Sequence, residues 1–294
     1  MTEFKRVGVL GAGLMGSGIA QVAAVAGCSV MVRDLEQSFL DRARKGIEGS
    51  TAKFVEKGKL AEADRAAALG RLSFGTELEA LTGSDLIIEA VTEDLAVKNA
   101  LWKALDAACA ENVVFASNTS SLPIAAMAAV TGRADRFLGL HFFSPVPMMP
   151  LVEVIRTVAT SDETFERAIR FARSLGKEAV AARDTPGFIV NRLLVPYMID
   201  AAREAARGLA SIPDIDQAMK LGCGHPMGPL TLLDMIGLDT ALKVAEVMYQ
   251  EFREPQFAPP PVLRRMVTMG YLGRKSGRGF YDYSVTPPRP VAVA

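Results

Sequence analysis

The stretch VGVLGAGLMGSGIA at residues 7–20, with VMVRD following at 30–34, decides the fold of this chain. Residues 7–10 form a short apolar run typical of a buried strand, and the glycines after it have the spacing G-x-G-x-x-G. In this motif Gly11 permits a tight turn, Gly13 lets the backbone approach a diphosphate, and Gly16 lets the next helix pack closely on the strand. We therefore predict a β-turn-α-β unit that holds a dinucleotide at the N-terminus of a helix.

An acidic residue at the end of the second strand indicates which dinucleotide is bound. Asp34 lies 34 − 16 = 18 residues after Gly16, where a carboxylate accepts hydrogen bonds from ribose hydroxyls and repels a 2′-phosphate. This favours NAD over NADP, although the neighbouring cation Arg33 keeps NADP open. Methyltransferases also have a glycine-rich turn and an acid at these places, so the motif alone does not exclude them. The predicted cofactor contacts in the loop are Gly11, Gly13, Leu14, Met15 and Gly16.

Strand-like and helical segments alternate through the first two thirds of the chain. Further strands are predicted at 85–91, 113–118, 137–143, 151–155 and 177–183, and helices at 15–26, 97–110 and 162–175. Such alternation is typical of an α/β fold with a doubly wound, Rossmann-type parallel sheet. From there on the periodicity is helical, and Asp184-Thr185-Pro186 predicts the start of a long helix that runs to about Arg207. We predict a Rossmann-like NAD-binding domain at 1–184 and a second, all-α domain at 185–294.

The bulk composition excludes several classes of partner. Lys plus Arg and Asp plus Glu number 33 each, so the formal net charge is zero and no long-range field attracts nucleic acid or an anionic membrane. No stretch approaches the roughly 18 apolar residues of a membrane span, and no signal peptide is evident. The three widely spaced cysteines indicate neither a metal site nor a disulfide framework. We expect a cytoplasmic protein without a metal.

The chain has only two histidines, and one of them is a candidate general base. His141 follows an apolar strand, at the sheet edge where open α/β sheets bind ligands. Its imidazole can take a proton from a hydroxyl near neutral pH. Glu153 is an acid among apolar residues in LVEVI, and if buried it needs a partner. A carboxylate on the other ring nitrogen would orient the imidazole. A core histidine and a solvated glutamate are the alternative.

Polar residues elsewhere have two interpretations each. The loop SNTSSL at 117–122 follows another strand at the same edge, and its side chains either contact a ligand or cap the next helix. Asn191 is expected one to two turns inside the helix that begins near Pro186. Asparagine is a poor helix former, so Asn191 indicates either a specific hydrogen bond to a ligand or a contact between helices.

Six motifs in order and spacing identify a family. GAGLMG, SNTSSL, HFFSPVPMMPLVEVI, DTPGFIVNRLLVPY, HPMGPL and GRGFYDY together resemble the L-3-hydroxyacyl-CoA dehydrogenase family from residue 6 to about 283. The bacterial 3-hydroxybutyryl-CoA dehydrogenases are the nearest subgroup in length and layout. The resemblance rejects the methyltransferase interpretation. It implies reversible, NAD-dependent oxidation of an L-3-hydroxyacyl-CoA to the 3-oxoacyl-CoA, as in fatty acid metabolism.

The resemblance also implies roles for individual residues. The family's catalytic base and its orienting glutamate fall on His141 and Glu153, and the residues that hold the reacting oxygen fall on Ser120 and Asn191. The implied cofactor contacts, besides the glycine loop, are Asp34, Glu93, Lys98 and Asn118. The implied coenzyme A contacts are Ser50 and Lys57, in a segment whose cations (Arg42, Arg44, Lys45, Lys53, Lys57 and Lys59) can pair with phosphates. The family typically forms a homodimer through its second domain, which also takes part in substrate binding.

Two positions depart from the family pattern, and two other functions remain open. Ser144 stands where the family usually has Asn, and Pro150 where it often has Lys. These changes touch neither the base nor its partner, so activity is still expected.

The same scaffold also serves dehydrogenases of free hydroxy acids such as L-gulonate. A non-catalytic NAD-binding protein is a third hypothesis, which the retained His141 and Glu153 argue against.

Overall fold

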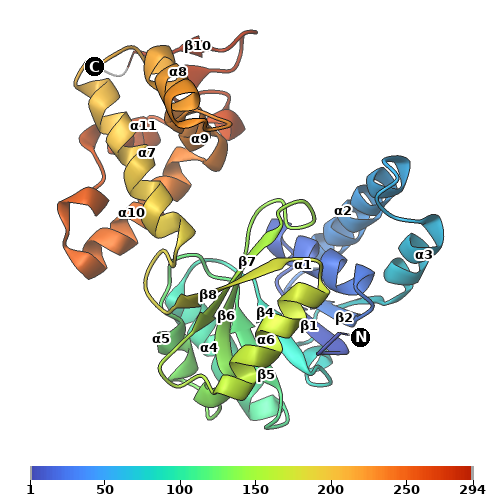
Figure 1. The fold of residues 1–294 in the computed structure, drawn as a ribbon. Coiled ribbons are helices and arrows are strands. Elements are labelled where there is room, and N and C mark those ends of the chain that lie inside the picture. Colours follow the sequence, from blue (N-terminus) through green and yellow to red (C-terminus); the bar gives the residue numbers. More distant parts are fainter. Residues whose placement is uncertain (1, 293–294) are drawn as a thin grey trace. The chain divides into compact units, whose positions relative to one another are not determined.

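The chain forms two compact units, Met1–Thr185 and Pro186–Ala294. They are seen in a computed structural model that describes residues 2–292 (Figure 1). Each unit has its own core of buried apolar side chains.

The first unit is built on one eight-stranded sheet in the order β3-β2-β1-β4-β5-β6-β7-β8. Every neighbouring pair is parallel except β6 and β7, which are antiparallel. The predicted doubly wound α/β sheet is thereby confirmed, but β7 and β8 run opposite to the other strands, which the alternation did not reveal. The strands are β1 (Arg6–Leu10), β2 (Ser29–Arg33), β3 (Leu72–Gly75), β4 (Leu86–Glu89), β5 (Val114–Ser117), β6 (Phe137–Phe142), β7 (Leu151–Arg156) and β8 (Glu178–Arg183).

Helices cover both faces of this sheet (Figure 1). On one face, Val7 and Val9 of β1 share a core with Ile19 of α1 and Ala168 of α6. On the other face, Trp102 of α4 packs against aromatic rings of β5 and β6, with ring centroids 4.8–4.9 Å apart. The helices are α1 (Leu14–Val25), α2 (Gln37–Glu56), α3 (Glu62–Gly70), α4 (Leu95–Ala108), α5 (Ile124–Ala128) and α6 (Asp162–Ser174), with short 3-10 turns η1 (Leu78–Leu81) and η2 (Ala134–Arg136).

The second unit is helical, as predicted, with a short strand pair near its end. It contains α7 (Val190–Ala206), α8 (Ile212–Cys223), α9 (Pro229–Ile236), α10 (Leu238–Phe252) and α11 (Pro261–Thr268), the 3-10 turns η3 (Pro255–Phe257) and η4 (Arg274–Ser276), and the strands β9 (Tyr281–Asp282) and β10 (Arg289–Pro290). No helix among residues 2–292 combines the length and apolarity needed to cross a bilayer.

The predicted start of the first helix in this unit is wrong. A turn precedes α7, because Gly187 and Phe188 have φ angles of +82° and +46°, in the left-handed region that a right-handed helix cannot use. Asp184 does not cap this helix either. Its carboxylate accepts hydrogen bonds from the backbone N–H groups of Ile124 and Ala125, at 2.9 and 2.6 Å, and so caps α5. Asn191 is consequently the second residue of its helix.

Two of the motifs, HPMGPL and GRGFYDY, contain residues that donate hydrogen bonds to buried aspartates of the second unit. Asp216 accepts hydrogen bonds from Leu230 N–H, at the start of α9, and from the Tyr281 hydroxyl, at 2.8 and 2.9 Å. Asp234 accepts from the backbone N–H groups of Phe280 and Tyr281, at 2.8 and 2.9 Å. HPMGPL and GRGFYDY therefore have a structural role, since they supply the donors that satisfy these carboxylates.

Candidate active site

The glycine loop after β1 has the geometry of a dinucleotide cradle. Gly11 has a φ of +105°, and a Cβ added at Gly16 would lie 1.8 Å from the Gly11 carbonyl oxygen. Gly13 faces open space and is the N-cap of α1, with no side chain hydrogen-bonded over the helix end. The first N–H groups of α1 are thus left for an anion, and Leu14 and Met15 flank them. The residues present fit the diphosphate of NAD.

Asp34 follows β2 and is held against the glycine loop. Its two carboxylate oxygens accept hydrogen bonds from the backbone N–H groups of Ala12, at 2.6 Å, and Leu35, at 2.7 Å. The side chain of Arg33 turns elsewhere, because its Nε donates to the carbonyl oxygen of Thr76 at 2.8 Å. The acid at the end of β2 is therefore fixed beside the cradle, while the neighbouring cation is bound to the loop after β3.

His141 and Glu153 meet across the antiparallel pair of strands. The register of β6 and β7 places the two residues opposite each other, and His141 Nδ1 lies 2.6 Å from Glu153 Oε2. Their exposed fractions are 6% and 0%. A carboxylate that accepts a hydrogen bond from Nδ1–H makes Nε2 the basic nitrogen and stabilises positive charge on the ring. The arrangement can take a proton from a hydroxyl group.

The SNTSSL loop lies beside this pair at the same sheet edge. Asn118 is buried, and its Oδ1 accepts a hydrogen bond from Phe142 N–H at 2.9 Å, which ties the ends of β5 and β6 together. Thr119 caps its own loop by accepting from Leu122 N–H at 3.0 Å. Ser120 is partly exposed, and its backbone N–H donates to Glu93 Oε1 at 3.1 Å. Asn118 and Thr119 therefore make structural contacts at this edge of the sheet and within the loop.

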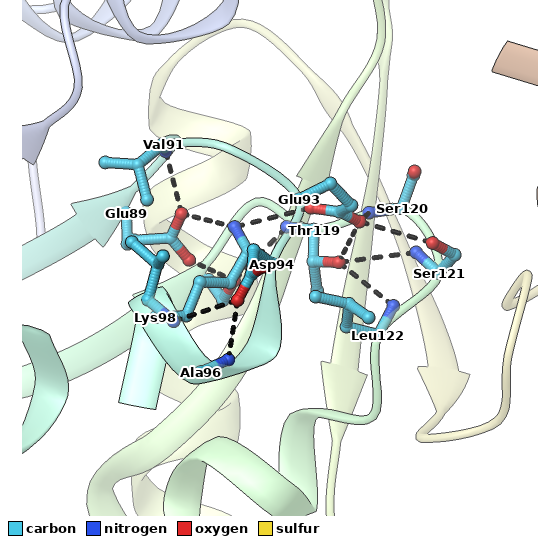
Figure 2. Close-up of polar contacts among 12 residues, drawn as sticks. Glu89, Val91, Glu93, Asp94, Ala96, Lys98, Thr119, Ser120, Ser121 and Leu122 are labelled. Carbon is cyan, nitrogen blue, oxygen red and sulfur yellow. Dashed lines mark hydrogen bonds and ion pairs between the residues drawn. The ribbon is translucent and has the colours of Figure 1, made fainter. Parts of the chain in front are cut away.

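Glu93 and Lys98 form part of a charged cluster behind the loop (Figure 2). Lys98 is 1% exposed, and its Nζ lies 2.5 Å from Glu89 Oε1 and 3.3 Å from Glu93 Oε2. Burial raises the pKa of the Glu93 carboxyl, but the Lys98 ammonium and hydrogen bonds from Thr119 and Ser120 outweigh it and hold this pKa below its usual value. Sequence reasoning missed Glu89. It is an acid within the apolar run DLIIEAV, but its pairing with Lys98 is seen only in the folded chain.

A buried lysine that the sequence did not single out holds the loop between β6 and β7. Lys177 is 7% exposed, and its Nζ donates to the carbonyl oxygens of Val146 and Met149 at 2.6 and 2.8 Å. Desolvation lowers the pKa of this ammonium. The two departures from the family pattern, Ser144 and Pro150, are exposed residues of the same loop. Lys177 therefore fixes the segment that joins the strand of His141 to the strand of Glu153.

The remaining predicted residues lie on other elements. Ser50 is a partly exposed residue of α2, and Lys57 is its exposed C-cap. Asn191 belongs to the second unit. The structure thus brings His141, Glu153, Asn118, Ser120, Glu93 and Lys98 to one edge of the sheet, and Ser50 and Lys57 lie on a helix of the same unit.

Comparison with known proteins matches both units. Residues 6–185 match the family model of the 3-hydroxyacyl-CoA dehydrogenase NAD-binding domain, and residues 187–283 match that of its C-terminal domain. The chain is 49% identical over 281 residues to a 3-hydroxybutyryl-CoA dehydrogenase of Mycobacterium tuberculosis, covering 95% of this chain and 98% of the relative. It is 50% identical over 286 residues to a mitochondrial hydroxyacyl-coenzyme A dehydrogenase of Rattus norvegicus, covering 95% and 91%.

A solved structure agrees with these matches. The (S)-3-hydroxybutyryl-CoA dehydrogenase of Ralstonia eutropha superposes with a TM-score of 0.93 at 48% identity. The alignment covers 96% of this chain and 100% of that one. The similarity therefore extends over both units and not only over the nucleotide-binding part.

Proposed function

The chain belongs to the 3-hydroxyacyl-CoA dehydrogenase family, and on that premise we propose which of its residues carry out the reaction. It is an NAD-dependent 3-hydroxyacyl-CoA dehydrogenase, with 3-hydroxybutyryl-CoA as the substrate that its relatives' names indicate. The rejected alternatives are a methyltransferase and a protein that only binds NAD.

His141 is the general base in this proposal, and Glu153 is its partner. The single observation that carries the assignment is the buried contact of 2.6 Å between His141 Nδ1 and Glu153 Oε2. During oxidation Nε2 of His141 takes the proton of the substrate's 3-hydroxyl group, and the Glu153 carboxylate stabilises the imidazolium that forms. In the reverse direction the imidazolium returns the proton to the oxygen of the 3-oxo group.

Other residues position the reactants. When bound, NAD supplies the acceptor for the hydride that leaves C3 of the substrate. We assign Ser120 and Asn191 to the reacting oxygen, because both carry small side chains that can hydrogen-bond to it. Asp34 is assigned to the adenosine ribose. The other coenzyme contacts are assigned to the glycine loop and to Glu93, Lys98 and Asn118.

The coenzyme A portion of the substrate is assigned to α2. Ser50 and Lys57 lie on this helix and its C-cap, and Lys53 follows Ser50 by three residues, so it lies on the same helix face. Exposed cations there can pair with the CoA phosphates although the net charge of the chain is zero. In this assignment the first unit binds NAD and also binds the nucleotide end of the substrate.

We propose that Asn191 of the second unit binds the substrate and that this unit forms a homodimer. Support for the dimer comes from large apolar side chains that this unit exposes, among them Leu193, Leu209 and Leu221 at 70–74%. We propose a cytoplasmic location, which suits the free thiols of Cys28, Cys109 and Cys223.

Initial rates with a series of 3-oxoacyl-CoA thioesters test the proposal. The purified protein should reduce acetoacetyl-CoA with NADH, and should use NADPH much less well because Asp34 repels a 2′-phosphate. Oxidation of L-gulonate with NAD is the matching assay for a dehydrogenase of free hydroxy acids. Turnover of L-gulonate without turnover of any acyl-CoA would refute the proposed substrate class.

A further inference from the structure

The cluster behind the SNTSSL loop contains a carboxylate that the proposed mechanism does not use. Glu89 is the last residue of β4 and is fully buried. It is paired in register with Leu10 of β1 on one side and Ser117 of β5 on the other. Glu89 therefore lies between the strand that leads into the glycine loop and the strand that leads into the SNTSSL loop.

Every described contact of the Glu89 carboxylate comes from a hydrogen-bond donor. Oε1 accepts from Lys98 Nζ at 2.5 Å and from Val91 N–H at 2.8 Å (Figure 2). Oε2 accepts from the Ser117 hydroxyl at 2.6 Å. A buried charge is tolerated when it is paired and hydrogen-bonded in this way. Its position is consequently well defined, and it can act as a fixed anchor for the Lys98 ammonium.

Lys98 stands between two carboxylates and lies closer to Glu89 than to Glu93. Its Nζ is 2.5 Å from Glu89 but 3.3 Å from Glu93. Glu93 in turn uses its Oε1 to accept hydrogen bonds from the Thr119 hydroxyl, from Ser120 N–H and from the Ser121 hydroxyl. One chain of contacts therefore runs from Glu89 to the backbone of Ser120.

We propose that Glu89 is a positioning residue: by holding Lys98, it leaves Glu93 bound to the SNTSSL loop and so keeps Ser120 in place for the substrate. Without the charge of Glu89, Glu93 is the carboxylate that still pairs with the Lys98 ammonium. The attraction between Lys98 and Glu93, which Glu89 no longer opposes, draws the Glu93 carboxylate toward the lysine and away from Ser120 N–H. The inference rests on the proposed role of Ser120.

The variant Glu89→Gln tests this arrangement, because glutamine keeps the size and an acceptor oxygen but removes the charge. Two measurements are needed: hydrogen exchange at the Ser120 amide, and kcat/KM for acetoacetyl-CoA with NADH. We expect faster exchange at Ser120 and a kcat/KM that falls about 10- to 100-fold, as for the loss of one charge-assisted hydrogen bond. The amide measurement needs no substrate, so it remains informative if the parent enzyme does not turn over acetoacetyl-CoA.

A matched control lies at the opposite end of the same strand. Asp85 immediately precedes β4 and accepts hydrogen bonds from Lys5 and Arg6, at the amino edge of the sheet. Asp85→Asn should lower the melting temperature but leave Ser120 exchange and kcat/KM at the parent values. If Glu89→Gln behaves as this control does, with kcat/KM within about twofold of the parent, the role proposed for Glu89 is wrong.

A second variant covers the case in which Glu89→Gln does not fold. The double change Glu89→Gln with Lys98→Met removes both buried charges, and such neutral replacements are often tolerated. In this variant no ammonium draws Glu93 away from Ser120 N–H, so exchange at the Ser120 amide is expected at the parent value. Faster Ser120 exchange than in the parent, in a folded double variant, would overturn the proposal, because the pull of Lys98 would then not be its cause.

Discussion

Replacing Glu153 by glutamine separates the charge of this residue from its shape. In the folded protein Glu153 is fully buried and its Oε2 lies 2.6 Å from His141 Nδ1. Glutamine can still accept a hydrogen bond from Nδ1–H through its amide oxygen, so the orientation of the ring is retained. What the variant loses is the negative charge opposite the imidazolium that forms when His141 takes the substrate proton.

The size of this loss follows from the geometry of the pair. For charge centres about 4 Å apart at an effective dielectric constant of about 20, the attraction is about 4 kcal/mol. At 1.36 kcal/mol for each factor of ten, this corresponds to a decrease in kcat of about 10³-fold. NADH does not carry the reacting proton, so its affinity should remain at the parent value.

The assay is steady-state reduction of acetoacetyl-CoA by Glu153→Gln, with NADH affinity measured separately by fluorescence titration. We expect kcat to fall by about 10³-fold with an unchanged NADH dissociation constant. A decrease of less than about tenfold in a correctly folded variant would show that the charge of Glu153 contributes little, and would refute this part of the mechanism.

Three further predictions concern other parts of the molecule. Gly16→Ala should abolish NADH binding, since its Cβ would lie 1.8 Å from the Gly11 carbonyl oxygen. The added Cβ of Gly13→Ala points into open space, so this variant should bind NADH at least about tenfold more weakly with an unchanged melting temperature. An unchanged NADH affinity of Gly13→Ala in a fluorescence titration would contradict the proposed diphosphate site at the glycine loop. Glu93 has a pKa below its usual value of 4.5 in the folded state, so its carboxylate contributes stability above pH 4.5 that is lost as the pH falls through the folded pKa. The difference in unfolding free energy between the parent and Glu93→Gln, measured by urea titration, should therefore shrink below pH 4.5, and a constant difference would contradict the assignment. Asp216→Asn should cost the second unit about 3 kcal/mol, because buried donors lose their acceptor, and an unchanged urea midpoint would exclude that role.

Much of the first unit could be predicted because its signals are local. A strand, a glycine turn and an acid occur within residues 7–34, and the physical reasons for each act over a few residues. The strand direction at β7 could not be predicted in this way. Apolar periodicity marks a strand but does not say which neighbour it pairs with, and the antiparallel register that joins His141 to Glu153 depends on the whole sheet.

The errors at other positions also have a tertiary cause. Asp184-Thr185-Pro186 has the local pattern of a helix start, but Asp184 caps a helix elsewhere and the backbone at Gly187 and Phe188 is left-handed. Glu89 was missed because a buried acid at a strand end becomes informative only when Lys98 is seen against it. The local sequence pattern therefore predicts the helices and strands, whereas the partners of buried charges can be identified only in the folded chain.

The most direct test of the account is the substitution of His141, the proposed base. His141→Gln removes the group that exchanges the proton but keeps a hydrogen-bonding side chain beside Glu153. We expect single-turnover reduction of acetoacetyl-CoA to be abolished while the NADH dissociation constant stays at the parent value. Turnover at the parent rate in this variant would contradict the central claim that His141 carries the proton.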